Sequence, residues 1–173
     1  LKQKIGVDVL AQTFGQIAFE VLKANLFDRQ SYVGPRTKYN YFISNREVAQ
    51  KMGYQALGNL SAEWVAWHVM NAVRAFCYSA DSEILLKHVK DTAFSLSAHD
   101  KELIISLAHE MWELTIKPNP GDLRPLPFRQ YHAIKQFSLL DISLPVKYRF
   151  ILIDESHDLS QPLLQILDRS RQS

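Results

Sequence analysis

The fold indicated by the sequence depends on one stretch, Tyr148-Arg149-Phe150-Ile151-Leu152-Ile153-Asp154-Glu155. Residues Phe150 to Ile153 are apolar without interruption, which is typical of a parallel strand that other elements cover on both faces. The expected strand over Tyr148–Ile153 ends in two adjacent carboxylates, and open α/β sheets bind their ligands at this carboxyl edge. The stretch therefore predicts an α/β fold with a ligand site at Asp154 and Glu155.

A second strand is expected near the other end of the chain. Val7-Asp8-Val9-Leu10-Ala11 is a short, valine-rich apolar segment, and from Thr13 to about Lys23 apolar residues recur at helical spacing. Towards the carboxyl end, Pro162 stands close to the start of a last helix, where proline is tolerated. Both ends of the chain thus read as a strand followed by a helix, which predicts one small parallel sheet.

Helices are predicted for most of the chain between these two units. Ser61, followed by a long apolar run, marks the capped start of the main helix. Pro118 and Pro120 end a later helix, because proline lacks an amide donor and clashes with the preceding turn. The expected helices cover about Asn45–Met52, Ser61–Phe76, Asp81 or Ser82 to Val89, Ser97 or Asp100 to Thr115, and Phe128–Leu140. The simplest architecture is an α/β sheet domain interrupted by a mainly α-helical insertion.

Composition limits the class of protein without indicating its function. A chain of 173 residues with 47% hydrophobic residues can bury a core. Its single cysteine, Cys77, is expected to be a packing residue, allows no internal disulfide and fits a reduced compartment. The net charge of +2 is too small to indicate nucleic acid by itself. No run approaches about 18 apolar residues and no signal peptide is recognisable, so a soluble intracellular protein without a membrane partner is expected.

The two carboxylates at the end of the expected strand suit nucleotide hydrolysis. In a nucleotide hydrolase the first, here Asp154, holds Mg²⁺ through its water shell, and the second, here Glu155, accepts a proton from the attacking water. Both tasks need an anionic oxygen, and neighbouring side chains of an extended segment point in different directions. Since many strands end in acidic residues, the assignment depends on the residues that follow, Ser156-His157-Asp158-Leu159.

Asp154-Glu155-Ser156-His157-Asp158 resembles the Asp-Glu-x-Gln-Asp motif of the UvrD-like superfamily 1 DNA helicases, with His157 in place of the glutamine. The resemblance implies ATP and Mg²⁺ as cofactors. It places Asp154 on the metal through water, Glu155 beside the metal as the catalytic base, and His157 and Asp158 in the nucleotide site.

A second segment resembles the same family far upstream. Thr13-Phe14-Gly15-Gln16 is similar to a Thr-Phe-His-Ser turn of the family. There a strand ends in this turn, a helix begins at it, and the turn contacts single-stranded DNA. Thr13 and Phe14 agree with that turn, whereas Gly15 and Gln16 replace its last two residues. The resemblance implies Thr13, Phe14 and Gln16 as DNA-binding residues. The alternative for Phe14 is a place in the core.

Two further segments are similar to the F-box DNA helicases and their bacterial relatives. Val73–Glu83, with Lys87–Val89 after it, is similar to an inserted subdomain in which a helix ends in Phe-x-x-Ser-Ala-Asp-Glu-Glu. Pro127–Gln136 is similar to a Thr-His-Asp-Gly-Tyr-x-Lys-Leu stretch that the family uses near the DNA path. Tyr131 matches its tyrosine, and Arg129 is a candidate phosphate contact because of its charge.

These resemblances together imply a fragment of a first motor domain with a partial RecA-like (P-loop NTPase) parallel sheet. Residues 1–25 and 127–173 would belong to that domain, and residues 26–126 would form the helical inserted subdomain. The parent would be an ATP-dependent 3′-to-5′ DNA helicase of DNA repair or recombination, in the bacterial cytoplasm (nucleoid) or the eukaryotic nucleus. Its partners would be single-stranded DNA, duplex junctions and a second motor domain of the same chain. The fragment alone is expected to be inactive, since no Gly-x-x-x-x-Gly-Lys-Ser/Thr sequence occurs in it.

Other interpretations stay open at this point. The chain could be a helical DNA- or protein-binding module with a relic ATPase motif, or part of a helicase–nuclease fusion. A transition-metal site at Asp154, His157 and Asp158 is disfavoured by the strand context. The tryptophans are expected in the core rather than stacked on bases, because a helix apolar on most sides is usually buried; they are Trp64, Trp67 and Trp112.

Overall fold

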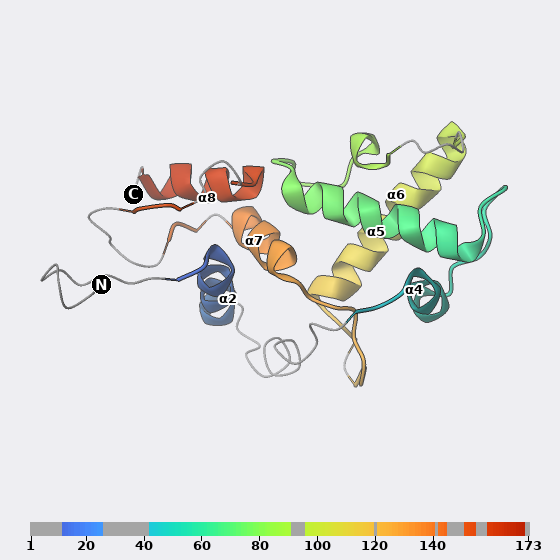
Figure 1. The fold of residues 1–173 in the computed structure, drawn as a ribbon, viewed down its shortest axis with the longest axis horizontal. Coiled ribbons are helices and arrows are strands. Elements are labelled where there is room, and N and C mark those ends of the chain that lie inside the picture. Colours follow the sequence, from blue (N-terminus) through green and yellow to red (C-terminus); the bar gives the residue numbers. More distant parts are fainter. Residues whose placement is uncertain are drawn as a thin grey trace, which may run out of the picture.

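The computed structural model describes residues 12–25, 42–90, 96–119, 121–140, 142–144, 151–154 and 159–171, and these residues are helical or irregular (Figure 1). Its elements, in chain order, are α2 (Phe14–Asn25), α4 (Asn45–Met52), α5 (Ala62–Tyr78), the 3₁₀ turn η2 (Leu86–His88), α6 (Ala98–Ile116), α7 (Gln130–Leu139) and α8 (Gln161–Arg171). Within these described ranges no strand forms, and the sole β-type pairing is an isolated antiparallel bridge between Leu57 and Leu60.

The prediction of an α/β fold with a RecA-like parallel sheet is therefore wrong for the part of the chain that the structure describes. Residues 151–153 form no strand, and the side chains of Ile151 and Leu152 are 45% and 96% exposed. A strand needs a neighbour to pair with its backbone N–H and C=O groups. None of the described segments pairs with residues 151–154 in this way. Val7–Ala11 and residues 148–150 lie outside the described residues.

The predicted helices are confirmed where the sequence supplies caps. Ser44 accepts a hydrogen bond from the backbone N–H of Glu47, whose carboxylate accepts one in return, and this capping box starts α4. Gly53 ends the same helix in the left-handed region with φ of 68°, which glycine adopts without strain. Ser61 caps α5, and Ser97 forms a second capping box at the start of α6. The predicted helix up to Val89 is wrong, because the structure has only the single turn η2 there.

Helix α5 packs against most of the other helices. Figure 1 shows α5 running through the middle of the molecule, with α6 crossing behind it, α4 near its start, and α7 and α8 near its end. The first hydrophobic cluster joins α4, α5 and α6, with Phe76 and Trp112 in edge-to-face contact 5.3 Å apart. Cys77 is buried in this cluster, as expected from the sequence.

A second hydrophobic cluster joins the two ends of the chain. It contains residues of α2, of α7 and the loop before α7, and of α8: Ala18, Val21, Leu22, Phe128, Ala133, Phe137 and Ile166. The buried residues of the first cluster all fall between Ile43 and Leu126. The division into residues 1–25, 26–126 and 127–173 stays a prediction. Within the described ranges, no helix combines the length and apolar composition that crossing a membrane requires.

Candidate nucleic-acid interface

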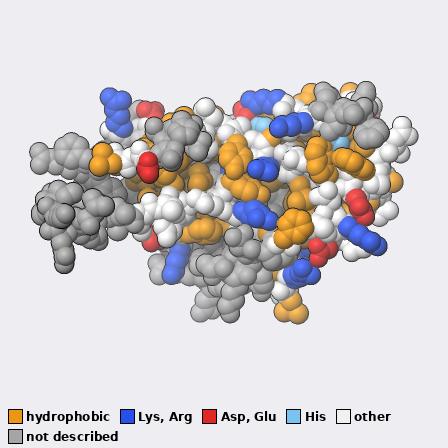
Figure 2. Space-filling model, viewed as in Figure 1, with side chains coloured by type: hydrophobic (Ala, Val, Ile, Leu, Met, Phe, Trp, Pro, Cys, Tyr) orange, Lys and Arg blue, Asp and Glu red, His pale blue; other side chains and the backbone are white. Residues whose placement is uncertain are grey.

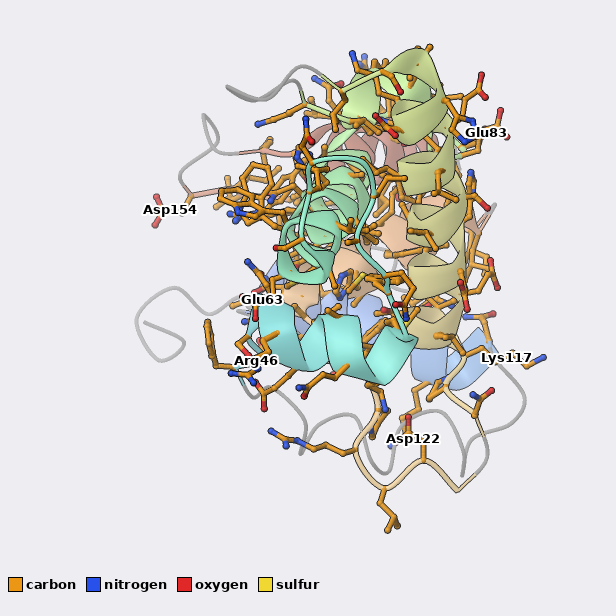
Figure 3. The ribbon with its side chains drawn as sticks, turned by 90° about the vertical axis from the view of Figure 1, so that its right-hand side faces the viewer. Arg46, Glu63, Glu83, Lys117, Asp122 and Asp154 are labelled. Atoms are coloured by element: carbon orange, nitrogen blue, oxygen red, sulfur yellow. The ribbon has the colours of Figure 1, made fainter. Side chains whose placement is uncertain are left out.

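Of the residues predicted to bind Mg²⁺ and ATP, only Asp154 lies within the described residues, so the predicted site stays a prediction. Asp154 is exposed, and Figure 3 shows its carboxylate standing away from the helices. Glu155, His157 and Asp158 lie outside the described residues. Across the described ranges, no three His, Cys, Asp or Glu side chains gather to hold a metal ion. The sequence contains no phosphate-binding loop, so the loop that would hold the phosphates of a magnesium–nucleotide group is not supplied by this chain.

The start of α2 and the start of α7, both predicted to contact DNA, lie against each other. A Cβ added to Gly15 would overlap the side chain of Gln130, so the glycine lets the two helix starts approach with that side chain in its observed position. The rings of Phe19 and Phe128 meet edge to face at 5.7 Å in the same region. The structure thus brings together two segments more than 110 residues apart in the sequence.

The turn at the start of α2 has a clear structural task. The backbone N–H of Thr13 donates to Oε1 of Gln16 at 2.9 Å, and the N–H of Gln16 donates to Oγ1 of Thr13 at 3.2 Å. This reciprocal pair is a capping box, which satisfies two amide donors that a helix start leaves open. Phe14 is half-buried. The polar groups of Thr13 and Gln16 therefore stabilise α2, and their contact with DNA stays a prediction.

Two tyrosines meet where the end of α5 faces the start of α7. The rings of Tyr78 and Tyr131 lie 5.8 Å apart with a tilt of 32°, and 47% of Tyr78 is exposed. Burial raises the pKa of the Tyr131 hydroxyl, and the nearby guanidinium groups of Arg129 and Arg74 oppose that rise. We call these four residues, Tyr78, Tyr131, Arg74 and Arg129, the tyrosine–arginine site. Sequence reasoning found Tyr131 and Arg129 but missed Tyr78 and Arg74.

A buried lysine holds the two helices of this site together. Lys135, one turn after Tyr131 on α7, is fully buried, and burial lowers its pKa. Its ammonium donates to the carbonyl oxygens of Ser79 and Asp81 just after α5, and it lies 4.3 Å from the centre of the Phe76 ring. A buried ammonium is costly without such partners, so these contacts fix where α7 sits on the end of α5.

The turn after α5 is built from the residues that resemble the F-box DNA helicases. Asp81 pairs with the ammonium of Lys87 at 2.7 Å and with Nε2 of His88 at 3.0 Å. The hydrogen bond from Lys87 is the main reason that the pKa of Asp81 falls to about 2. Nδ1 of His88 accepts the N–H of Leu85 at 2.8 Å, so the ring is neutral, and burial lowers its pKa. These residues have a structural role that supports the tyrosine–arginine site.

Helix α8 is attached to both sides of the junction. The side-chain amide of Gln165 donates to the carbonyl of Ala80 at 2.9 Å. The guanidinium of Arg169 donates to the carbonyl of Ser138 at 2.9 Å and to that of Leu140, at the carboxyl end of α7. A cation suits this end of a helix, where the carbonyl groups carry partial negative charge. The helix that follows Asp154–Asp158 in sequence therefore contacts both the end of α5 and the end of α7.

The tryptophans differ from the prediction that all three are core residues. Trp112 is buried, in agreement with it. Trp64 is 45% exposed and Trp67 is half-buried, so that prediction is wrong for Trp64. The sequence could have revealed the exposure of Trp64, because Trp64 and Trp67 are three residues apart and therefore share one face of the helix. Val65, Val69 and Ala72 lie on a different face.

Comparison with known proteins gives one similarity. No family model matches the chain, and no solved structure matches it. The chain is similar to F-box DNA helicase protein 1 of Schizosaccharomyces pombe, with 21% identity over 147 residues. The aligned part covers 79% of this chain and 16% of that protein, so the chain spans about a sixth of the length of its curated relative. The similarity points to a helicase-related origin.

Proposed function

We propose that the chain is a helical DNA-binding part of a helicase-related protein and that it binds single-stranded DNA at the tyrosine–arginine site. The observation that carries this proposal is the pairing of Tyr78 with Tyr131 beside Arg74 and Arg129. Bases stack on aromatic rings, and a guanidinium matches a phosphate with two parallel hydrogen bonds. Both kinds of contact tolerate any base, so binding without sequence preference is expected.

Two further observations support DNA as the ligand. The relative of the chain is named a DNA helicase, and the similarity covers 79% of this chain. Figure 2 shows Lys and Arg side chains among hydrophobic ones on the face of the molecule that α5 and α7 form. Cations beside aromatic residues are typical of surfaces that bind single strands. The alternative is that a protein partner binds the tyrosine–arginine site, and the experiment must distinguish this from DNA binding.

The test is binding of a fluorescent oligothymidylate to the chain, measured by anisotropy at several salt concentrations. Two phosphate contacts predict a slope of log K against log salt of about −1.4, at about −0.7 per phosphate of a single strand. Tyr131→Ala is expected to weaken binding by about 5- to 150-fold, the range for one lost base stack, and Tyr131→Phe to preserve it. Arg74→Ala should reduce the slope by about 0.7.

Lys117→Ala supplies the matched control for the loss of a positive charge. Lys117 is exposed, and Figure 3 shows it on the side of the molecule opposite Glu63 of α5. Its replacement should leave both the affinity and the salt slope unchanged. If Lys117→Ala and Arg74→Ala weakened binding equally, the binding would be nonspecific attraction to the net charge, and the proposed site would be wrong.

ATP-driven 3′-to-5′ translocation and unwinding is a separate proposal, made for a longer protein that carries this chain. It is supported by the resemblance of Asp154–Asp158 to a helicase motif, with Asp154 and Glu155 as the residues for Mg²⁺ and ATP and a second motor domain as partner. Its test is DNA-stimulated ATP hydrolysis by that longer protein. Glu155→Gln is expected to lower the rate about 10²- to 10⁴-fold, the usual range for losing a general base. Equal rates would refute this proposal and leave the DNA-binding proposal intact.

A further inference from the structure

The outer face of α5 extends the tyrosine–arginine site in a straight line. Trp64, Trp67, Asn71, Arg74 and Tyr78 follow one another at steps of three or four residues. At about 100° per residue they fall within about 80° of the helix circumference. The buried residues of α5, such as Val69 and Phe76, lie on the opposite side against α4 and α6. We call these five residues the α5 aromatic face.

We propose that the α5 aromatic face carries the same single strand of DNA beyond the tyrosine–arginine site, with bases stacked on Trp64 and Trp67. This inference rests on the proposed function, because Arg74 and Tyr78 belong to both surfaces. The strand would contact an aromatic pair at each end of α5, with Arg74 between the pairs. The occupant is single-stranded nucleic acid rather than duplex, because stacking on a side chain requires an unpaired, accessible base.

Charge supports this occupant. From Trp64 to Tyr78, helix α5 carries no carboxylate, and its one cation in that range is Arg74. Arg74 is exposed, and it forms no ion pair with any carboxylate in the described part of the chain. An exposed guanidinium on a face without acidic groups suits a phosphate.

The aromatic residues at the far end of the face are already arranged as a pair. The rings of Trp64 and Trp67 meet edge to face at 5.6 Å, which leaves ring surface of Trp64 exposed. The side-chain amide of Asn71 donates to the carbonyl of Trp67 at 2.8 Å, one turn along the same face. Trp64 and Trp67 thus form an aromatic pair at one end of the face, and Tyr78 pairs with Tyr131 at the other. The hydrogen bond fixes the side chain of Asn71 between them.

The length of the face sets the length of DNA that can occupy it. Tyr78 lies fourteen positions after Trp64 in the sequence. At about 1.5 Å per residue they span about 21 Å. A stacked single strand advances about 3.4 Å per nucleotide, so the face accommodates about six nucleotides, and fewer if the strand is extended. A tetranucleotide can therefore occupy the tyrosine–arginine site alone, whereas a dodecanucleotide reaches both aromatic pairs.

The experiment compares dT4 with dT12 on the whole chain and on single variants. Trp64→Ala is expected to weaken binding of dT12 by about 5- to 150-fold and to leave dT4 unchanged. Tyr131→Ala should weaken both oligonucleotides. Trp64 is 45% exposed and lies outside the buried core, so its loss should leave the fold intact, which circular dichroism checks. Leu103→Ala, at an exposed apolar residue of α6, is the matched control and should bind both as the wild type does.

Tryptophan fluorescence gives a second readout that does not depend on affinity. Bases stacked on Trp64 and Trp67 should quench their emission when dT12 is added. Trp112→Phe, which removes the buried tryptophan, should retain the quenching. Trp64→Phe keeps a ring for the base and should therefore retain binding while it loses part of the quenching.

The outcomes separate this inference from the proposed function. If Trp64→Ala binds dT12 as tightly as the wild type while Tyr131→Ala weakens both oligonucleotides, the path along α5 is wrong and the proposed function stands. If the wild type binds neither oligonucleotide, both are wrong. If the α5 aromatic face instead mediates self-association that Trp64→Ala abolishes, without any effect of DNA, the occupant is a second copy of the chain and the inference is overturned.

Discussion

The end of α5 and residues 151–154 are alike in sequence and differ in structure. Each consists of apolar residues followed shortly by an aspartate, Asp81 in one and Asp154 in the other. At the end of α5, Phe76 is buried by neighbouring helices, and Asp81 is held by Lys87 and His88. In the second stretch Leu152 is exposed to solvent. The comparison teaches that an apolar run becomes core only where other elements cover it, and that its acidic residue takes its role from its neighbours.

The largest expected effect tests how the end of α5 is held. Lys135→Met keeps the apolar stem but leaves the carbonyls of Ser79 and Asp81 without their donor. Each unsatisfied buried acceptor costs about 1–3 kcal/mol, so we expect the free energy of unfolding to fall by about 2–4 kcal/mol in urea titration. Lys87→Met, on the exposed side of the same turn, should cost at most about 1 kcal/mol. Equal, small losses for both would mean that the buried ammonium does not hold the junction.

An intermediate effect comes from His88 and depends on pH. Burial lowers the pKa of His88 in the folded chain, so the unfolded chain binds the proton more readily. Stability from this residue is therefore complete above about pH 6.5, the unfolded value, and decreases as pH falls below it. Asp81, whose pKa falls to about 2, stays ionised next to the ring in this range, and His68, whose pKa burial also lowers, acts in the same direction.

The measurement for this prediction is the urea midpoint at pH 7.5 and at pH 5.5. The wild type should lose stability on acidification. His88→Asn keeps an oxygen that can accept the N–H of Leu85 but cannot gain a proton, so its midpoint should change less between the two pH values. An equal change in both proteins would assign the pH dependence to His68 or to other groups.

The smallest effect is expected in the second stretch. Leu152→Ser replaces a side chain that is 96% exposed, so the free energy of unfolding should change by no more than about 0.5 kcal/mol. If residues 151–153 were instead a covered strand, the loss of a buried leucine would cost about 2–5 kcal/mol. Thermal and urea unfolding of this one variant therefore decides between the observed arrangement and the strand that the sequence predicted.

Helices could be predicted from sequence because their signals are local. Ser44 with Glu47, and Ser97 with Asp100, place capping boxes three residues apart, and the structure starts α4 and α6 there. The start of α7 was also approximately right, within two residues of Phe128. The prediction of a strand over Tyr148–Ile153 failed for residues 151–153, because pairing partners are distant in sequence and an apolar run does not reveal whether they exist.

The candidate site was only half predictable for a related reason. Tyr131 was predicted from the resemblance to known helicases and Arg129 from its charge, and both arguments consider one segment at a time. Tyr78 and Arg74 join them only through the packing of α7 on α5, which Lys135 fixes over more than 50 residues of sequence. The exposed side of α5 was missed because the helix was judged apolar on most sides and therefore buried as a whole, without regard to the angular position of Trp64.

The attachment of α8 has a mechanical consequence. Eleven residues of helix make a stiff rod about 16 Å long, and it is tied through Gln165 to Ala80 and through Arg169 to Ser138. A pull on residue 159 along the axis of this rod would load both ties, because Gln165 and Arg169 belong to the same helix. Displacement of the segment just after Asp154–Asp158 would therefore be transmitted to the ends of α5 and α7 together. The rings of Tyr78 and Tyr131, which lie on these two helices, would move with them.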